Sequence, residues 1–181
     1  MSNKNKATHT GECQCCGRQQ KLPGGSLSTH GYTKEHGFFQ GICIGAGHLP
    51  FEQSKDLVER CIANAGKEID ARNAHKLEVA KLHEQTLGYV RHYSYGYTST
   101  IKAKIVQTDT HSFCYETSDG KRNRIVQYSS DYPKSAEECA KFCNARYSKE
   151  IDREIASVRT YIKWQQARAE NWTPKALTPI K

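Results

Sequence analysis

The sequence predicts an α+β fold in which a small β-hairpin module is followed by two long antiparallel helices that flank a small antiparallel β-meander. Three observations predict this fold. The first 50 residues are rich in glycine and hold cysteines and histidines at close spacing. Two long segments further on repeat their apolar residues every three to four positions, which is typical of helices. Residues 88–130, between them, alternate their side chains with a period of two, as strands do.

We expect four segments along the chain. Residues 1–8 form a flexible N-terminus, residues 9–53 the small module, residues 54–172 a helix–β-meander–helix domain, and residues 173–181 a loose tail. Apolar residues make up only 36% of the chain, which is below the average for globular proteins. The core is therefore expected to be thin and spread along the helices.

Two cysteines separated by two residues, Cys13 and Cys16, can place both thiolates on one tetrahedral zinc ion from a tight turn. Cys43 is the third ligand by its position. Cys15 is expected to point away from the zinc ion, although the choice between Cys15 and Cys16 as the second ligand stays open. A short glycine-rich segment buries too little apolar area to fold alone. Residues 9–53 are therefore expected to form a zinc-binding module, whose closed four-ligand Zn²⁺ site is structural.

The fourth zinc ligand is either His30 or His48. His48 follows Cys43 by five residues and can share a loop with it. His30 lies in a turn-like Thr-His-Gly-Tyr run and can close the site from a hairpin. His9 and His36 are weaker candidates.

The first helix is expected to run from Ser54, as its N-cap, to about Thr86. Its stripe consists of Ile62, Ala65, Ile69, Asn73, Leu77, Ala80 and Leu87.

Pro133 and Ser135 introduce a second long helix. Its stripe consists of Ala136, Ala140, Cys143, Tyr147, Ile151, Ile155, Val158, Ile162, Gln165, Ala169 and Trp172. From Ile151 onward the spacing is heptad-like and requires a partner helix, as in a coiled coil. We expect the first helix to be that partner. The facing residues would be Ile151, Ile155, Val158 and Ile162 on one side and Ile62, Ile69 and Leu77 on the other. Pairing of this seam between two chains is the alternative, so we expect a monomer or a homodimer.

Residues 88–130 are expected to form three or four antiparallel strands, with Tyr89, Ile101, Ala103 and Ile105 on one face. Aromatic rings can stack on bases while Lys and Arg bind phosphates, and the formal charge of +8 suits a polyanion. The candidate nucleic-acid-binding residues are Tyr93, Tyr95, Tyr97, Lys102, Lys104, Lys121, Arg122 and Arg124. The alternative is that tyrosines simply favour strands and that the basic pair at 121–122 is a solvated hairpin tip.

No Ser-His-Asp order, phosphate-binding glycine loop or paired carboxylates stand out, so no catalytic residue is predicted. The remaining cysteines are expected in the core or at its flank: Cys61, Cys114, Cys139 and Cys143. The N-terminus lacks the apolar core of a signal peptide, and no run of 18 apolar residues occurs. We therefore expect no membrane association and a reducing, cytoplasmic compartment, in which such cysteines bind metal before they form disulfides.

The first module resembles a group of short bacterial and phage proteins of unknown function. In these, a Cys-x2-Cys/His-Gly-Tyr/Gly-x-Cys zinc-finger segment precedes a long helical region. The resemblance covers residues 13–54 and rests on Cys13, Cys16, His30, Gly31, Tyr32, Gly37, Gly41, Cys43, Gly45, Gly47, Pro50, Glu52 and Ser54. It implies His30 as the fourth ligand, an origin in bacteria or a mobile element, and the cytoplasm of a bacterial host cell. It implies no activity.

The same segment is also similar to the zinc-bound frame of His-Me finger endonucleases, which combine a histidine-bearing hairpin with two Cys-x2-Cys pairs. Those enzymes place an acidic residue beside the catalytic histidine. Here Thr29 precedes His30, and Ala46 occupies the position of the last cysteine. Both departures argue against nuclease chemistry.

These observations predict a non-enzymatic zinc-binding interaction protein that contacts nucleic acid through a basic, tyrosine-rich surface. The alternative is a phage- or mobile-element-encoded adaptor or inhibitor that binds a host protein complex through its helical arm. A degenerate His-Me finger nuclease is the third hypothesis.

Overall fold

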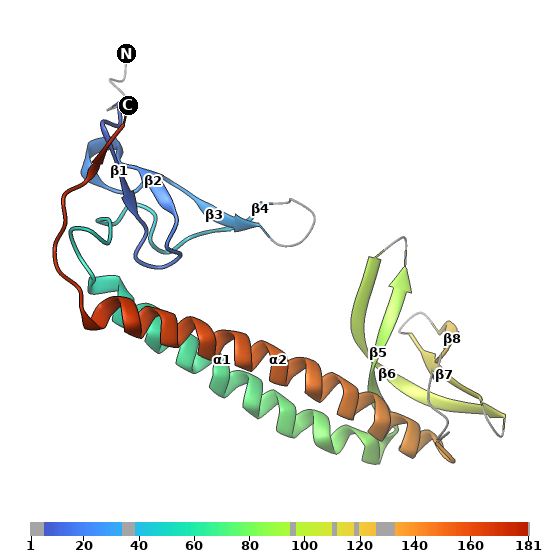
Figure 1. The fold of residues 1–181 in the computed structure, drawn as a ribbon. Coiled ribbons are helices and arrows are strands. Elements are labelled where there is room, and N and C mark those ends of the chain that lie inside the picture. Colours follow the sequence, from blue (N-terminus) through green and yellow to red (C-terminus); the bar gives the residue numbers. More distant parts are fainter. Residues whose placement is uncertain are drawn as a thin grey trace. The chain divides into compact units, whose positions relative to one another are not determined.

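The structure, a computed structural model, describes residues 6–33, 39–94, 97–109, 112–117, 120–125 and 133–180. The chain divides into two compact units. The first unit contains Met1–Lys67 and Arg159–Lys181, and the second contains Glu68–Val158. Each of the two long helices contributes residues to both units (Figure 1). The first unit therefore extends beyond the expected module at residues 9–53, because it also includes one end of each helix.

Two small antiparallel sheets lie in the first unit, one with the strand order β2-β1-β9 and one that pairs β3 with β4. Their strands are β1 (His9–Glu12), β2 (Gln19–Lys21), β3 (Gly31–Thr33), β4 (Phe39–Ile42) and β9 (Thr178–Pro179). A short 3-10 helix, η1 (Pro23–Gly25), follows β2 in the chain. The sequence favours a hairpin with strands near residues 37–39 and 42–44, and the observed pairing differs from it. Phe39 and Ile42 lie together on β4, the partner strand β3 comes earlier in the chain, and Cys43 and Ile44 follow β4.

The C-terminal segment 173–181 was expected to be a loose tail, and this prediction is wrong. Thr178 lies opposite Thr10 in the register of β9 with β1. The Ile180 N–H donates a hydrogen bond to the Thr8 carbonyl at 2.9 Å. A two-residue strand leaves no periodicity in the sequence, so this backbone pairing could not be seen there.

The first long helix, α1 (Asp56–Lys81), begins and ends close to its predicted bounds at Ser54 and Thr86. The Ser54 hydroxyl accepts a hydrogen bond from the Asp56 N–H at 3.2 Å, so it satisfies one of the free donors at the helix start. A 3-10 turn, η2 (Leu82–Gln85), follows, and Thr86 ends the turn in the left-handed region at φ 55°.

The second long helix, α2 (Ala136–Glu170), begins directly after Ser135, as predicted. The Ser135 hydroxyl accepts a hydrogen bond from the Glu138 N–H at 3.1 Å, and the Glu138 carboxylate accepts one from the Lys134 N–H at 2.6 Å. Every position of the predicted stripe is buried or half-buried: Ala136, Ala140, Cys143, Tyr147, Ile151, Ile155, Val158, Ile162, Gln165, Ala169 and Trp172.

Four strands of the second unit form one antiparallel meander in the order β5-β6-β7-β8, as predicted. They are β5 (Leu87–Ser94), β6 (Tyr97–Asp109), β7 (Ser112–Glu116) and β8 (Arg122–Arg124). The single face predicted for Tyr89, Ile101 and Ala103 is wrong. The register pairs Gly88 with Ala103 and Val90 with Ile101, so even-numbered residues of β5 share a face with odd-numbered residues of β6. Tyr89 therefore lies on the other face.

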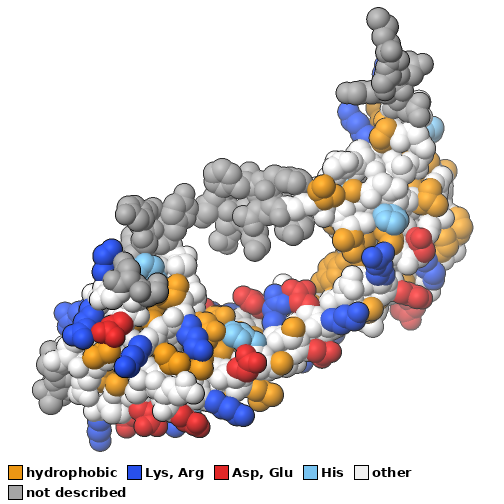
Figure 2. Space-filling model, turned by 180° about the vertical axis from the view of Figure 1, so that it is seen from behind, with side chains coloured by type: hydrophobic (Ala, Val, Ile, Leu, Met, Phe, Trp, Pro, Cys, Tyr) orange, Lys and Arg blue, Asp and Glu red, His pale blue; other side chains and the backbone are white. Residues whose placement is uncertain are grey.

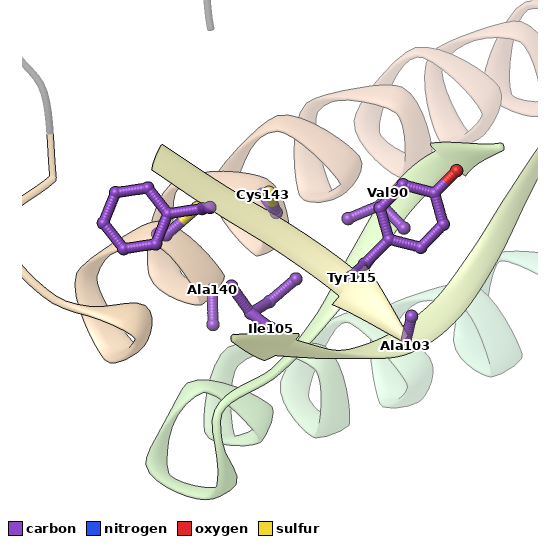
Figure 3. Packing of buried hydrophobic residues seen from close by; sticks show 8 residues of the cluster. Val90, Ala103, Ile105, Tyr115, Ala140 and Cys143 are labelled. Carbon is purple, nitrogen blue, oxygen red and sulfur yellow. The ribbon is translucent and has the colours of Figure 1, made fainter. Parts of the chain in front are cut away.

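The core of the second unit lies between this sheet and the start of α2. Val90 and Ile105 of the sheet belong to one buried cluster with Ala140 and Cys143 of the helix (Figure 3). A Cβ atom on Gly88 would lie 3.4 Å from the Ala140 Cα, so glycine permits this close approach of strand and helix. Of the cysteines expected in the core or at its flank, three are buried and one is half-buried: Cys61, Cys139 and Cys143, and Cys114.

Asn144, a buried polar residue of α2, ties the edge strand β5 to the helix. Its Nδ2 donates to the Leu87 carbonyl at 3.0 Å, and its Oδ1 accepts from the Tyr89 N–H at 3.0 Å. One side chain thus satisfies two backbone groups at a strand edge that would otherwise need water or another partner.

A second cluster in this unit joins the two helices. Val79 of α1 is buried with Ile151 and Ile155 of α2, and Ile69 packs against them. Ile151, Ile155 and Ile69 therefore lie in the seam, as predicted. Leu77 does not, because its side chain is 69% exposed.

Ile62, Ala65 and Ile69 of the predicted stripe are buried or half-buried, and charged residues of α1 explain why its later positions were misplaced. Arg72 pairs with Glu154 at 3.0 Å, and Lys76 pairs with Asp152 at 2.6 Å, which also shows that the helices run antiparallel here. The half-buried face of α1 passes through these two cations, so a search for apolar residues alone assigned the stripe to neighbouring positions. Three of those positions are exposed: Asn73, Leu77 and Ala80.

Within the described ranges, neither helix is long and apolar enough to cross a membrane. Several predicted features lie outside these ranges: residues 1–5 of the N-terminus, His36, Gly37 and Tyr95.

We predict that Ile155→Asp lowers the free energy of unfolding by about 3 kcal/mol or more, since it places an unpaired carboxylate in a buried apolar cluster. Leu77→Asp is the matched control, because Leu77 is exposed on the partner helix. Urea unfolding of both variants checks this. Equal stability of the two variants would mean that Ile155 is not in the core.

Candidate metal centre and basic pocket

A tight turn after β1 presents the first two candidate ligands. The Cys13 N–H donates to the Arg18 carbonyl at 2.9 Å, and the Gly17 N–H donates to the Cys13 carbonyl at 3.0 Å. Gly17 adopts φ +71°, the left-handed region that glycine enters without a steric cost. We call residues 13–17 the knuckle.

The β3–β4 hairpin brings the other two candidate ligands to the knuckle. His30 directly precedes β3 and Cys43 directly follows β4, and the Cys43 N–H donates to the His30 carbonyl at 2.8 Å. A second turn follows, in which the Ala46 N–H donates to the Cys43 carbonyl at 2.9 Å.

The ligand atoms of Cys13, Cys16, His30 and Cys43 all lie within 4.8 Å of one another. The Cys13 and Cys43 Sγ atoms are 3.8 Å apart. Two thiolates on a tetrahedral zinc ion, with Zn–S bonds of about 2.3 Å, are separated by about 3.8 Å. The geometry and the three-sulfur, one-nitrogen donor set therefore both fit Zn²⁺.

His30 has the tautomer that a metal ligand needs. Its Nδ1 lies 2.8 Å from the Ser28 carbonyl, which can only accept, so Nδ1 carries the proton. Its Nε2 is buried and has no hydrogen-bond partner among the described residues. Such an atom is rare unless an ion or a water binds it. His48, the alternative fourth ligand, is exposed and does not belong to the group of four.

The thiols of the group differ in how readily they ionise. A hydrogen bond from Cys15 lowers the pKa of Cys13 to about 4, and the same bond raises the pKa of Cys15. Burial raises the pKa of Cys43 to about 12 and also raises the pKa of Cys16. A divalent cation would offset the cost of ionising these thiols, one of which is buried and two of which are half-buried, so the donor set favours such an ion.

Gly45 leaves space for the sulfur atoms. A Cβ atom at this position would collide with the Cys13 Sγ and lie 3.5 Å from the Cys15 Sγ. The glycine is therefore required by the close approach of the second turn to the knuckle, and not by a special backbone angle.

Gln14, fully buried between Cys13 and Cys15 of the knuckle, caps helix α1 from outside the helix. Its Oε1 accepts a hydrogen bond from the Leu57 N–H at 2.8 Å. Its Nε2 donates to the Leu49 carbonyl at 3.0 Å and to the Asp56 carboxylate at 2.8 Å. The knuckle therefore satisfies a backbone donor that the first turn of a helix leaves free.

Residues of α2 bind the backbone carbonyls of the knuckle. Gln165, also fully buried, donates from Nε2 to the Gln14 carbonyl at 3.1 Å and to the Cys15 carbonyl at 2.9 Å. The Tyr161 hydroxyl donates to the same Cys15 carbonyl at 2.9 Å. The metal-ligand turn is thus fixed to both helices of its unit by hydrogen bonds.

Arg168 adds a charged contact to this network. It donates to the Gln14 carbonyl at 2.9 Å and pairs with the Glu12 carboxylate at 2.6 Å. Its guanidinium lies over the rings of Phe51 and Trp164, at 4.0 and 4.3 Å from their centroids. With a side chain only 11% exposed, this cation is held by both stacking and ion pairing.

Sequence reasoning missed these anchors, although two signals existed. Gln165 is a polar residue inside an otherwise apolar stripe, which indicates a buried hydrogen-bonding role. Gln14 is a polar residue between the candidate ligands Cys13 and Cys16. Its partners at Leu49 and Leu57 depend on the path of the chain after the hairpin and could not be inferred.

Four of the predicted basic residues share one face of the meander. Lys104 lies opposite Glu116, and Glu116 lies opposite Arg122. Lys102 lies two positions from Lys104 on β6, and Arg124 lies two positions from Arg122 on β8. Side chains two positions apart on a strand project to the same side, so all four share one face. All four cations are exposed, and Arg122 pairs with Glu116 at 2.8 Å.

The other predicted nucleic-acid-binding residues are less well defined. Lys121 is exposed just before β8. Tyr93 and Tyr97 belong to β5 and β6, but their side chains lie outside the described part of the structure, as does the whole of Tyr95.

A pocket of about 540 Å³ lies in the second unit. Its lining includes three arginines, four aromatic residues and one acidic residue: Arg91, Arg124, Arg146, Tyr89, Tyr115, Tyr147, Phe142 and Glu150. In Figure 2, Lys and Arg side chains lie beside hydrophobic ones on this unit. Among the predicted residues whose side chains the structure describes, only Arg124 lines the pocket. Arg91 and Arg146 were not predicted, because they come from β5 and α2 and meet only where the sheet packs on the helix.

Comparisons with protein-family models, curated proteins and solved structures found no match for this chain.

We predict that Gln14→Ala destabilises the first unit by about 2–4 kcal/mol, because it leaves the Leu57 N–H and other buried polar groups without their partner. Gln19→Ala is the matched control, since Gln19 is exposed on β2. Chemical denaturation with a tryptophan signal checks this. A loss of less than about 0.5 kcal/mol would show that water replaces the Gln14 side chain.

Proposed function

We propose that this chain is a non-enzymatic zinc-binding interaction protein that binds single-stranded nucleic acid. The zinc ion is structural, and the binding surface lies on the second unit. The cytoplasm of a bacterial host cell, implied by the resemblance to bacterial and phage proteins, is part of the same proposal.

The observation that supports zinc most strongly is the buried Nε2 of His30, which has no partner among the described residues and belongs to a group with three cysteines. Four protein ligands complete a tetrahedron and leave no position for water or substrate, so the ion would stabilise the fold and not catalyse a reaction. When bound, zinc would hold the three thiols as thiolates.

The observation that carries nucleic-acid binding is the combination of cations and rings in the pocket. Arg91 pairs with Glu150, the acidic residue of the lining, at 2.8 Å. The lining therefore carries more positive than negative charge, because it also contains Arg124 and Arg146. Phe142 is 47% exposed, so its ring is accessible for stacking. Arginine can bind phosphate while a ring stacks on a base.

The basic face of the meander extends this surface. Arg124 belongs both to the pocket lining and to the exposed row of Lys102, Lys104 and Arg122. A strand of nucleic acid could therefore place a base in the pocket and its neighbouring phosphates along the row. A protein partner of the helical arm, as in an adaptor or inhibitor, is the competing class.

We predict one tightly bound zinc ion per chain after purification without chelator. His30→Ala should lower zinc affinity by at least tenfold, since it removes one of four ligands. His48→Ala is the matched control and should bind zinc as the wild type does, because His48 lies outside the group. Metal analysis and competition with a chromogenic chelator measure both. The assignment fails if His48→Ala loses zinc and His30→Ala retains it.

We predict that the zinc-loaded protein binds mixed-sequence single-stranded DNA or RNA and that affinity falls steeply with salt, because phosphate contacts release counterions. Arg146→Ala should weaken binding about tenfold and reduce the salt slope by about 1. Arg153→Ala is the control, since Arg153 is exposed on the same helix and does not line the pocket.

Fluorescence anisotropy at several salt concentrations gives these values. Equal effects of the two substitutions would mean that only overall charge matters. No binding even at low salt, together with nuclease-resistant capture of a protein partner from cells, would favour the competing class.

A further inference from the structure

Two cysteines that do not belong to the group of four lie against each other beside it. Cys15 is part of the knuckle, and Cys61 lies in the second turn of α1. Their Sγ atoms are 2.9 Å apart. Both residues are buried, with 6% and 4% of their surfaces exposed.

The backbone at both positions is well anchored. The Cys15 carbonyl accepts hydrogen bonds from Tyr161 and Gln165 of α2. Cys61 is held within α1 and packs in the same apolar cluster as Leu57. A disulfide has an S–S bond of about 2.05 Å, so the two sulfurs need to approach by only about 0.9 Å, a distance that side-chain rotation can supply.

We propose that Cys15 and Cys61 form a reversible disulfide when the cell is exposed to a peroxide. One thiolate attacks a peroxide oxygen, which breaks the O–O bond and gives a sulfenic acid and one water. The second sulfur attacks the sulfenic sulfur and displaces its hydroxyl as a second water. Two thiols are thereby oxidised, and one peroxide is reduced. A dithiol reductant reverses the step by thiol–disulfide exchange.

The other cysteines are less suited to this reaction. Cys13, Cys16 and Cys43 belong to the candidate metal group, in which bound zinc would occupy their sulfurs. Cys139 and Cys143 lie four positions apart on one helix, where Cβ atoms are about 5–6 Å apart. A disulfide requires about 3.5–4.5 Å.

The consequence is a covalent link between the knuckle and α1. The bond would close a loop between positions 46 residues apart. It would fasten the knuckle to the helix independently of the metal ion.

The test uses the full-length, zinc-loaded protein, reduced and then freed of reductant. One equivalent of hydrogen peroxide is added and then removed with catalase, and the protein is denatured and alkylated. We expect the intact mass to show two fewer alkylated thiols than the reduced protein. We expect trypsin to release peptides 7–18 and 61–67 joined by a bond that dithiothreitol breaks. Zinc content should stay unchanged.

Three variants assign the bond. Cys15→Ser and Cys61→Ser should each abolish the linked peptide, and Cys143→Ser should retain it. The proposal is overturned if all eight cysteines remain alkylatable. It is also overturned if Cys15→Ser still links 7–18 to 61–67, since Cys13 or Cys16 would then be the true partner. Because the linked peptide is scored directly, the result does not depend on nucleic-acid binding.

Discussion

The first unit depends on how the knuckle uses both its side chains and its backbone. Cys13 and Cys16 face the group of four ligands, while the carbonyls of Gln14 and Cys15 face α2. The proposed metal site and the helix contacts would therefore stabilise the same five-residue turn.

This arrangement explains why the first unit includes helix ends that are distant in sequence. Gln14 caps α1, and Arg168 of α2 binds the knuckle carbonyl while it stacks on two rings. Loss of the metal would therefore be expected to weaken the helix ends as well as the hairpin. The second unit has its own apolar cores and carries the basic pocket, so the proposed binding of a polyanion and the proposed binding of metal would draw on different residues.

The sequence predicted the α+β class, the meander, the stripe of α2 and the grouping of Cys13, Cys16 and Cys43, because each leaves a local spacing or period. The spacing left His30 and His48 open as the fourth member of the group, and the resemblance favoured His30. Sequence reasoning misplaced the later part of the α1 stripe, where paired cations such as Arg72 occupy half-buried positions. It also missed the pairing of the C-terminal segment with β1, the pocket and the anchoring role of Gln14. These features arise from contacts between distant segments, and no single segment carries a pattern that reveals them.

The most direct test of a structural zinc site is X-ray absorption spectroscopy of the zinc-loaded protein at the zinc edge. The account predicts a four-coordinate ion with three sulfur ligands at about 2.3 Å and one imidazole nitrogen at about 2.0 Å. Loss of the imidazole signal in His30→Ala, but not in His48→Ala, would assign the nitrogen to the buried Nε2. Four sulfur ligands in the wild type would show that another cysteine replaces His30. A bound water would show an open site, and either result would contradict the account.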